Sequence, residues 1–297
     1  IFPFFGININ GDKLEASWDR FFCAEEFDIE WMFVDAQSVP TGTVVNNNYW
    51  ENDFDFNPLY KNGTLITTTA DNYQIDLTYP DGWLIVKMRP VFYYLTALPD
   101  KRRWEGQWRY EFIQLTGFEI DKNWEFTSSY IEEGNHKTVG NYSDPTGKVR
   151  QTITNLNSED KTIIAEQKYD YEGTPSLQFM PVPDNSNSLQ YRPLYNRNDV
   201  GSEYLKSDFA GIEQVANPSS NFSGSSKYYS NNNNSGSIHR DYIPDAQLYP
   251  LTQTWFDSKG RVSRQGGVGP LYQIGNEHET KFFYSSTSAT ELNRLFG

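Results

Sequence analysis

The sequence predicts an all-β fold, and three observations lead to that prediction. Aromatic residues make up 16% of the chain, and their flat rings pack well on the pleated surface of a sheet. Short runs of alternating apolar and polar residues recur about every ten residues, and Tyr73 to Leu77 is the strictest of them. The third observation is that no long stretch has helical periodicity.

Residues 14–118 are predicted to form a β-sandwich. Its expected strands include 27–34, 64–69, 73–77 and 83–89, which are β-branched, alternating or continuously apolar. We expect Tyr79-Pro80-Asp81-Gly82 to be a turn, in which Pro80 fixes φ and Gly82 permits a positive φ.

Four aromatic residues continue this pattern on even positions and are expected to share one sheet face: Trp104, Trp108, Tyr110 and Phe112. Exposed Trp50, Trp104 or Trp108 could stack on a pyranose ring, although packing in the core is the simpler interpretation. The basic cluster Lys101-Arg102-Arg103 is expected to be a solvated hairpin loop.

Charge and cysteine content limit the classes of partner. The formal net charge of −14 disfavours nucleic acids and anionic membranes, which are themselves negatively charged. No apolar run approaches the ~18 residues needed to span a bilayer, so direct membrane insertion is not expected. The single cysteine, Cys23, cannot form an internal disulfide and is predicted to be a buried small hydrophobe.

Three predicted turns of the second half share one pattern, in which an Asp precedes a Gly by three residues and an aromatic residue precedes the Asp. The Asp side chain would cap the turn, and the Gly would take the left-handed conformation of a hairpin. Hairpins stacked in this way would build an extended sheet. The three copies are Tyr142, Asp144 and Gly147; Tyr169, Asp170 and Gly173; and Phe256, Asp257 and Gly260.

Two further segments stand out. The stretch 184–240 is rich in Asn and Ser and is expected to be largely loop, since it has little apolar area to offset the entropy of ordering. The residues expected to anchor it are Tyr191, Leu194, Tyr195, Tyr204 and Phe209. At the end of the chain, Ser288 and Glu291 have the spacing of a capping box, which predicts a short helix ending near Gly297.

No residues form a catalytic, cofactor-binding or metal-binding pattern. The three histidines, His136, His239 and His278, are far apart, and the glycine-rich stretch 264–270 lacks the rest of a phosphate loop. Acidic residues such as those at 25–30 are numerous enough to cluster by chance, so a glycosidase pair is the weaker interpretation. The sequence therefore predicts a protein that is not an enzyme and that has no cofactor.

The second half resembles the segment that lies ahead of the repeat array in large Rhs-type surface proteins of the Bacteroidota. Its Tyr-x-Asp-x-x-Gly turns are similar to tyrosine–aspartate (YD) repeats. The stretches that carry the closer resemblance are 173–183, 243–250, 260–269, 275–284 and 291–297. Around Tyr79 to Trp83, the first half looks like a fibronectin type III-like sandwich. The resemblance thus implies two domains: a fibronectin III-like sandwich over 1–122, and a β-rich Rhs-associated domain over 123–297 containing the insertion 184–240.

The resemblance also implies a role. It indicates a non-catalytic structural or interaction segment of a large secreted protein, displayed at the cell surface after export by the type IX secretion system. Members of the family serve in gliding motility, adhesion or toxin delivery. The expected partners are downstream Rhs repeats of the same chain, an outer-membrane translocon or carrier protein, and a surface glycan. Since the chain begins at Ile1 and not at Met, we expect it to be part of a longer protein. The alternatives are a carbohydrate-binding module and a glycoside hydrolase.

Overall fold

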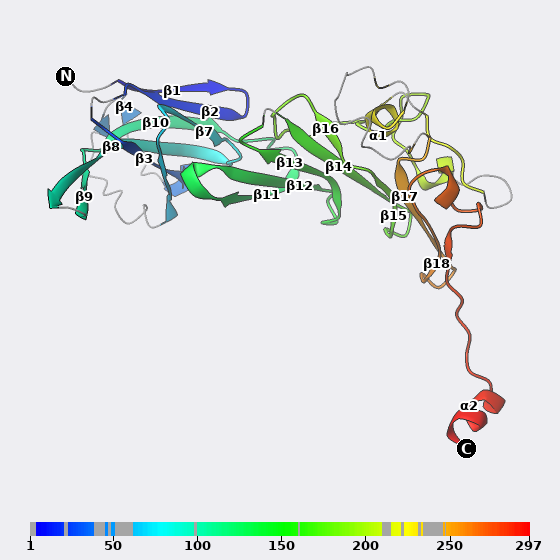
Figure 1. Ribbon diagram of the computed structural model, residues 1–297. Coiled ribbons are helices and arrows are strands. Elements are labelled where there is room, and N and C mark those ends of the chain that lie inside the picture. The colour runs from blue at the N-terminus through cyan, green and yellow to red at the C-terminus, as the bar shows by residue number, and fades with distance from the viewer. Residues whose placement is uncertain are drawn as a thin grey trace. The chain divides into compact units, whose positions relative to one another are not determined.

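The prediction of an all-β fold is confirmed by a computed structural model of the chain (Figure 1). The structure describes residues 4–20, 23–38, 45–46, 49–50, 62–97, 100–159, 161–209, 215–220, 223–230, 233, 246 and 248–297. Contacts divide the chain into two compact units that do not follow chain order. Unit 1 comprises 1–148, 153–162 and 184–191; unit 2 comprises 149–152, 163–183 and 192–297. The boundary expected at residue 122 remains a prediction.

Two antiparallel sheets make up the first part of unit 1. One has the order β1-β2-β7, and the other has the order β10-β8-β3-β6, with β9 also pairing with β8. Their strands are β1 (Phe5–Asn10), β2 (Lys13–Trp18), β3 (Glu26–Asp35), β6 (Thr64–Thr68), β7 (Asn72–Asp76), β8 (Asp81–Ala97), β9 (Asp100–Glu105) and β10 (Arg109–Thr116). A 3-10 turn, η1 (Ala36–Ser38), follows β3, and the short pair β4 (Val45–Asn46) and β5 (Tyr49–Trp50) follows η1.

The core lies where the inward faces of these sheets meet. Side chains point alternately to the two faces of each strand, and those on the inward face form the core. Leu14 and Ala16 from β2, Ile29 from β3, and Leu84 and Met88 from β8 are all fully buried. Burial of each large apolar side chain contributes about 1.5–3 kcal/mol. The two faces therefore account for a sandwich in this part of the chain.

The expectation that four even-numbered aromatic residues share one face is wrong. Trp104 pairs with Phe92 of β8, whereas Tyr110 pairs with Lys87. Positions 92 and 87 of β8 point to opposite faces, since side chains alternate along a strand. The alternation is not carried from β9 to β10, because residues 106–108 belong to neither strand.

Gly82 is likewise not a left-handed turn residue. It lies in β8, and its φ is not positive. A Cβ atom there would meet the carbonyl oxygen of Val34 at 2.4 Å, so close packing against β3 explains the glycine.

Unit 1 also contains the hairpin of β11 (Asn123–Tyr130) and β12 (His136–Ser143), joined through η3 (Glu132–Gly134). Gly140 pairs with Phe126, and a Cβ on Gly140 would lie 2.2 Å from the Phe126 ring. The glycine therefore gives the ring room to lie across the neighbouring strand. β13 (Val149–Leu156), β14 (Thr162–Tyr169) and β16 (Val182–Asp184) contribute residues to both units.

In unit 2, strands pair antiparallel in the order β14-β15-β17-β18-β19. The remaining strands are β15 (Pro175–Phe179), β17 (Leu251–Phe256), β18 (Val262–Gly266) and β19 (Thr280–Lys281). Short helices are η4 (Lys206–Phe209), α1 (Gly224–Tyr228) and η7 (Pro270–Tyr272).

Some of the expected anchors of the Asn-rich insertion are buried and others are not. Tyr204 and Phe209 pack with Leu177, Phe179 and Leu251 in a separate core. Tyr191 and Tyr195 are half-buried. Leu194 is 44% exposed and has a positive φ, so its expected role as an anchor is wrong. Much of the insertion, including 210–214 and 234–245 with His239, lies outside the described residues.

The predicted C-terminal helix is confirmed as α2 (Ala289–Phe296). Ser288 accepts a hydrogen bond from the Glu291 backbone N–H, the Glu291 side chain binds back to Ser288, and Gly297 is the C-cap.

Two other sequence expectations are wrong. Cys23 is exposed, with a φ of 83°. Lys101 to Arg103 lie within β9 and not in a loop. Within the described part of the chain, no helix is long and apolar enough to cross a membrane.

Candidate functional site

The three predicted turns share one hydrogen-bonding pattern. In each, the Asp carboxylate accepts backbone N–H groups two and four residues later: Thr146 and Lys148 for Asp144, Glu172 and Thr174 for Asp170, and Lys259 and Arg261 for Asp257. Gly147, Gly173 and Gly260 have φ of 80°, 76° and 73°, and each donates its N–H to the carbonyl of its Asp at 2.9–3.0 Å. Each Asp side chain therefore caps the backbone of its turn, which is the role expected of it.

A fourth copy lies at Asn198 and was missed in the sequence. Asn198 Oδ1 accepts the N–H groups of Val200 and Ser202 at 3.2 and 3.0 Å, and Gly201 has a φ of 82°. Gly201 N–H donates to the Asn198 carbonyl at 2.9 Å, as in the other three turns. The Asx-x-x-Gly spacing is visible in the sequence, but no aromatic residue stands one or two positions before Asn198, as it does before the three aspartates.

The aromatic residues of the turns make contacts along the strands. The Tyr169 hydroxyl donates to the Val149 carbonyl at 3.0 Å, and the Arg150 guanidinium lies 4.6 Å from the ring centroid. Lys206 Nζ lies 5.9 Å from the Phe256 ring centroid and 3.5 Å from Asp170. Tyr142 is buried, and its burial raises the pKa of its hydroxyl; the nearby Glu119 raises this pKa further. These contacts are structural, because each aromatic residue is held by atoms of its own unit.

The predicted stacking residues are not grouped. Trp104 is 57% exposed, and its ring centroid lies 5.3 Å from that of Phe92, with the planes tilted by 42°. Trp108 has Lys87 Nζ and the Arg89 guanidinium at 4.3 and 4.4 Å from its centroid, so cations already cover a ring face. The side chain of Trp50 lies outside the described residues.

Arg103, whose side chain is 35% exposed, reaches the buried carboxylate of Asp28. Its Nη2 lies 2.6 Å from both carboxylate oxygens of Asp28, which also accepts Arg89 Nε at 2.9 Å and Thr67 Oγ1 at 2.8 Å. Asp28 is fully buried, so two guanidinium groups and a hydroxyl offset the cost of removing the carboxylate from water. A carboxylate bonded in this way is a structural acceptor, not a general base.

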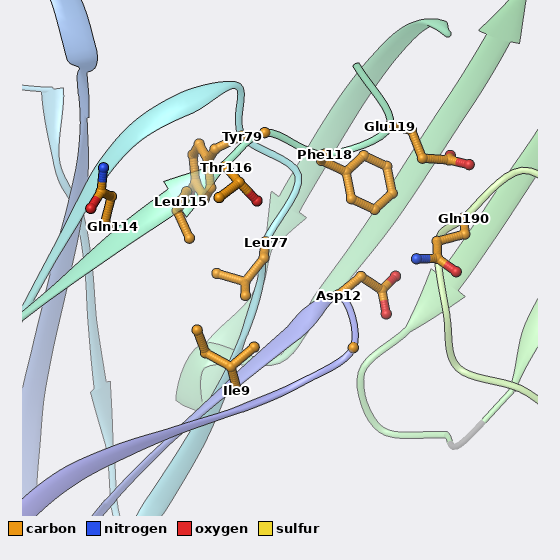
Figure 2. Close-up of a pocket in the computed structure, with 12 residues that line it drawn as sticks. Ile9, Asp12, Leu77, Tyr79, Gln114, Leu115, Thr116, Phe118, Glu119 and Gln190 are labelled. Carbon is orange, nitrogen blue, oxygen red and sulfur yellow. The ribbon is translucent and has the colours of Figure 1, made fainter. Parts of the chain in front are cut away.

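One pocket of unit 1 has a volume of about 240 Å³. Figure 2 shows residues that line it. Asp12, from the turn between β1 and β2, and Glu119, which follows β10, both line it together with Gln190. Apolar lining comes from Ile9, Leu77, Leu115 and Phe118. Two carboxylates in one pocket are the arrangement that a glycosidase would use.

Both carboxylates hold the chain at 188–191. Asp12 Oδ2 accepts the N–H of Leu189 at 2.5 Å and the hydroxyl of Ser188 at 3.2 Å. Glu119 Oε2 accepts the Tyr191 N–H at 2.9 Å and contacts the Tyr142 hydroxyl. One oxygen of each acid is therefore committed to the fold.

A second pocket of unit 1, with a volume of about 310 Å³, has a different lining. Aromatic side chains from two strands, β3 and β11, and from the loop before β8 line it: Trp31, Tyr79, Trp124, Phe126 and Tyr130. Polar lining comes from Thr64, Gln74, Thr78, Ser128, Asp76 and His136. The even positions of β11 supply Trp124, Phe126, Ser128 and Tyr130, since they share one face of the strand.

The charged groups at the floor of this second pocket neutralise each other. Asp76 Oδ1 lies 2.5 Å from Lys13 Nζ, and Asp76 Oδ2 accepts the Thr138 hydroxyl at 2.6 Å and lies 3.4 Å from His136 Nε2. Burial alone would raise the pKa of Asp76, but the bonds to His136, Lys13 and Thr138 outweigh it and lower the pKa to about 2. Asp76 is therefore an ionised, saturated carboxylate.

His136 also contacts Tyr73, at 3.1 Å from Nδ1 to the hydroxyl oxygen. The Tyr73 hydroxyl donates to the Gly134 carbonyl at 2.7 Å, and burial raises its pKa well above the usual range. A buried phenol that is protonated and hydrogen-bonded to the backbone is a poor nucleophile. The sequence did not indicate this cluster, because Lys13, Asp76 and His136 are more than 50 residues apart and share no motif.

Among the described residues, no group of three or more His, Cys, Asp or Glu side chains could hold a metal ion. No protein-family model matches the chain. A search of curated proteins finds no significant match.

Proposed function

We propose that this chain is a non-catalytic structural and interaction module of a large, exported, surface-displayed protein of the Rhs type. The observation that carries the proposal is the shared bonding pattern of the Asx-x-x-Gly hairpins at Asp144, Asp170, Asn198 and Asp257. Recurrence of one hairpin in one bonding pattern is typical of repeat architectures, in which each unit packs on its neighbours.

The state of four carboxylates that are buried or line the first pocket favours a structural role for them over hydrolysis. Asp28 and Asp76 are buried and saturated by cations and hydroxyls, while Asp12 and Glu119 bind backbone N–H groups. A retaining or inverting glycosidase needs one carboxyl group free to donate a proton and a second free to act on the sugar or on water. In this role the chain would connect to downstream repeats and contact an export translocon or carrier protein.

Surface display is tested on intact cells of the organism that produces the protein. An antibody raised against this chain should label unpermeabilised cells, and protease added outside should remove the signal. A cytosolic protein of the same cells serves as the control and should be labelled only after permeabilisation. Labelling of this chain only after permeabilisation would contradict the proposal of surface display.

A further inference from the structure

The second pocket of unit 1, lined by Trp31, Tyr79, Trp124, Phe126 and Tyr130, is called the aromatic pocket below. It combines three properties that are not needed for a structural connector. It is concave, it is lined by aromatic rings, and it presents polar groups that have no partner in the described part of the chain. Its volume of about 310 Å³ lies at the lower end of the usual range for small-molecule sites, about 300–1,000 Å³. That volume suits one ring-sized ligand better than an extended chain.

Several polar groups of the pocket have unused hydrogen-bonding capacity. The side chains of Thr64, Gln74 and Thr78 have no hydrogen-bond partner among the described residues. The Tyr79 oxygen accepts Trp31 Nε1–H at 3.2 Å, which leaves its own hydrogen free to donate. The pocket can therefore both donate and accept, as a ligand with several hydroxyl groups requires.

The charges of the pocket exclude an ionic ligand. Of the described residues that line it, Asp76 and His136 are the ones that can carry a charge, and Asp76 is already paired with Lys13. Among the described lining residues, the Asp76 carboxylate is therefore compensated and offers no free negative charge to an ammonium group. Bringing such a group in would require desolvating it without a counter-charge.

The aromatic lining residues of β11 are at least partly accessible to solvent. Tyr130 is 40% exposed, while Trp124 and Phe126 are half-buried. Trp31 is 2% exposed, and its ring centroid lies 6.0 Å from that of Tyr130, so it backs the wall. A ring with apolar C–H groups on its faces and hydroxyl groups on its edge would complement such a lining.

We propose that this pocket binds a single neutral sugar ring, as a terminal or side residue of a glycan. Tyr130, Trp124 and Phe126 of β11 would contact the face of the pyranose. Gln74, Thr64, Thr78 and the Tyr79 hydroxyl would bind its hydroxyl groups. The site differs from the stacking surface expected at Trp104 and Trp108, and it goes beyond the proposed surface-module function.

The test is saturation-transfer-difference NMR on the full chain with methyl glycosides of glucose, galactose, mannose and N-acetylglucosamine, followed by titration of any that bind. Galacturonic acid and N-acetylneuraminic acid are the charged comparisons. We expect at least one neutral glycoside to bind with a millimolar Kd, about −4 kcal/mol, and the acids to bind more weakly or not at all. Tyr130→Ala and Gln74→Ala should each weaken binding about fivefold.

Trp104→Ala is the matched control, because Trp104 is an exposed aromatic residue of the same unit outside the pocket, and its variant should bind normally. Gln74 is exposed and its side chain has no hydrogen-bond partner among the described residues, so Gln74→Ala keeps the test valid even if Tyr130→Ala fails to fold. Absence of transfer from every neutral glycoside would overturn the proposal, as would loss of binding in Trp104→Ala but not in Gln74→Ala, or a preference for the acidic sugars. Each of these results leaves the surface-module proposal intact.

Discussion

Lys13 and Asp76 form an ion pair inside unit 1, with side chains only 4% and 8% exposed and 2.5 Å between Nζ and Oδ1. The pair joins β2 to β7, whose backbones also pair at these two residues. Through Thr138 and His136, it also links β7 to β12. One carboxylate thus connects three strands below the aromatic pocket.

Removing the Asp76 charge should destabilise unit 1 strongly. Asp76→Asn leaves the Lys13 ammonium buried without its counter-charge, and the expected loss is about 3–5 kcal/mol in the free energy of unfolding. Urea denaturation measures it. Asp71→Asn is the control, because Asp71 pairs with Arg20 at the surface, at 3.5 Å, and should lose less than about 1 kcal/mol. Equal losses in the two variants would contradict the account of the buried pair.

The same carboxylate predicts the response to acid. Folding lowers the pKa of Asp76 from its ordinary value of 3.8 to about 2, so its contribution to stability is complete above pH 3.8. The contribution is lost as the pH falls through about 2, and it amounts to about 2 kcal/mol. Unfolding curves recorded across this range should show a steeper acid limb for the unmodified chain than for Asp76→Asn. An unchanged limb in the variant would show that Asp76 does not titrate in this way.

The hairpin glycines should respond alike to substitution. Gly147, Gly201 and Gly260 have φ of 80°, 82° and 73°, and a Cβ on any of them would meet no atom within 4 Å. Their replacement by Ala therefore costs only the left-handed conformation, about 1 kcal/mol each. Replacement by Asn should cost less, since Asn tolerates this region better. Thermal unfolding of the six variants is the measurement, and unequal losses across the three sites would indicate that the turns are not equivalent.

Asn198 should behave like the aspartates of the other turns. Asn198→Ala removes the acceptor for the N–H groups of Val200 and Ser202 and should cost about 1 kcal/mol. Asn198→Asp keeps an acceptor oxygen at the same place and should unfold close to the unmodified chain. Urea denaturation separates the two variants. If Asp proves as damaging as Ala, the fourth turn does not use the side-chain bonds described above.

Lys168 should be important for unit 2. Its ammonium lies 3.1 Å from Glu166 and 2.6 Å from Glu203, and the side chains of Lys168 and Glu166 are 6% and 1% exposed. Lys168→Met would leave the Glu166 carboxylate buried without a cation and should cost about 3–5 kcal/mol. Hydrogen exchange should show the loss in β14 and β15. The double variant Lys168→Met with Glu166→Leu should recover part of the stability, and an absence of recovery would contradict a role for the unpaired charge.

The sequence predicted those features that depend on local chemistry. The hairpins of Asp144, Asp170 and Asp257 and the capping box of Ser288 each lie within a few residues, so spacing alone indicated them. The sheet face of Trp104 was predicted wrongly. The alternation of side chains between the two faces of a strand cannot be carried across an interruption of unknown length. Cys23 was predicted wrongly because apolar neighbours in the sequence do not fix which way one side chain points.

The second pocket could not have been predicted. Its lining brings Asp76, which pairs with Lys13, and His136 together with residues of β3 and β11, all far apart in the chain. Such a site depends on which strands pair, and strand pairing is set by the packing of the whole unit rather than by any local motif.

The central claim is that this chain is a module of a longer, repeat-bearing surface protein, and mass spectrometry of the intact parent protein tests it most directly. The account predicts a polypeptide far longer than these residues, whose downstream peptides contain many further Tyr-x-Asp-x-x-Gly turns and a C-terminal export domain. A parent protein that ends near Gly297 and contains no such repeats would contradict it.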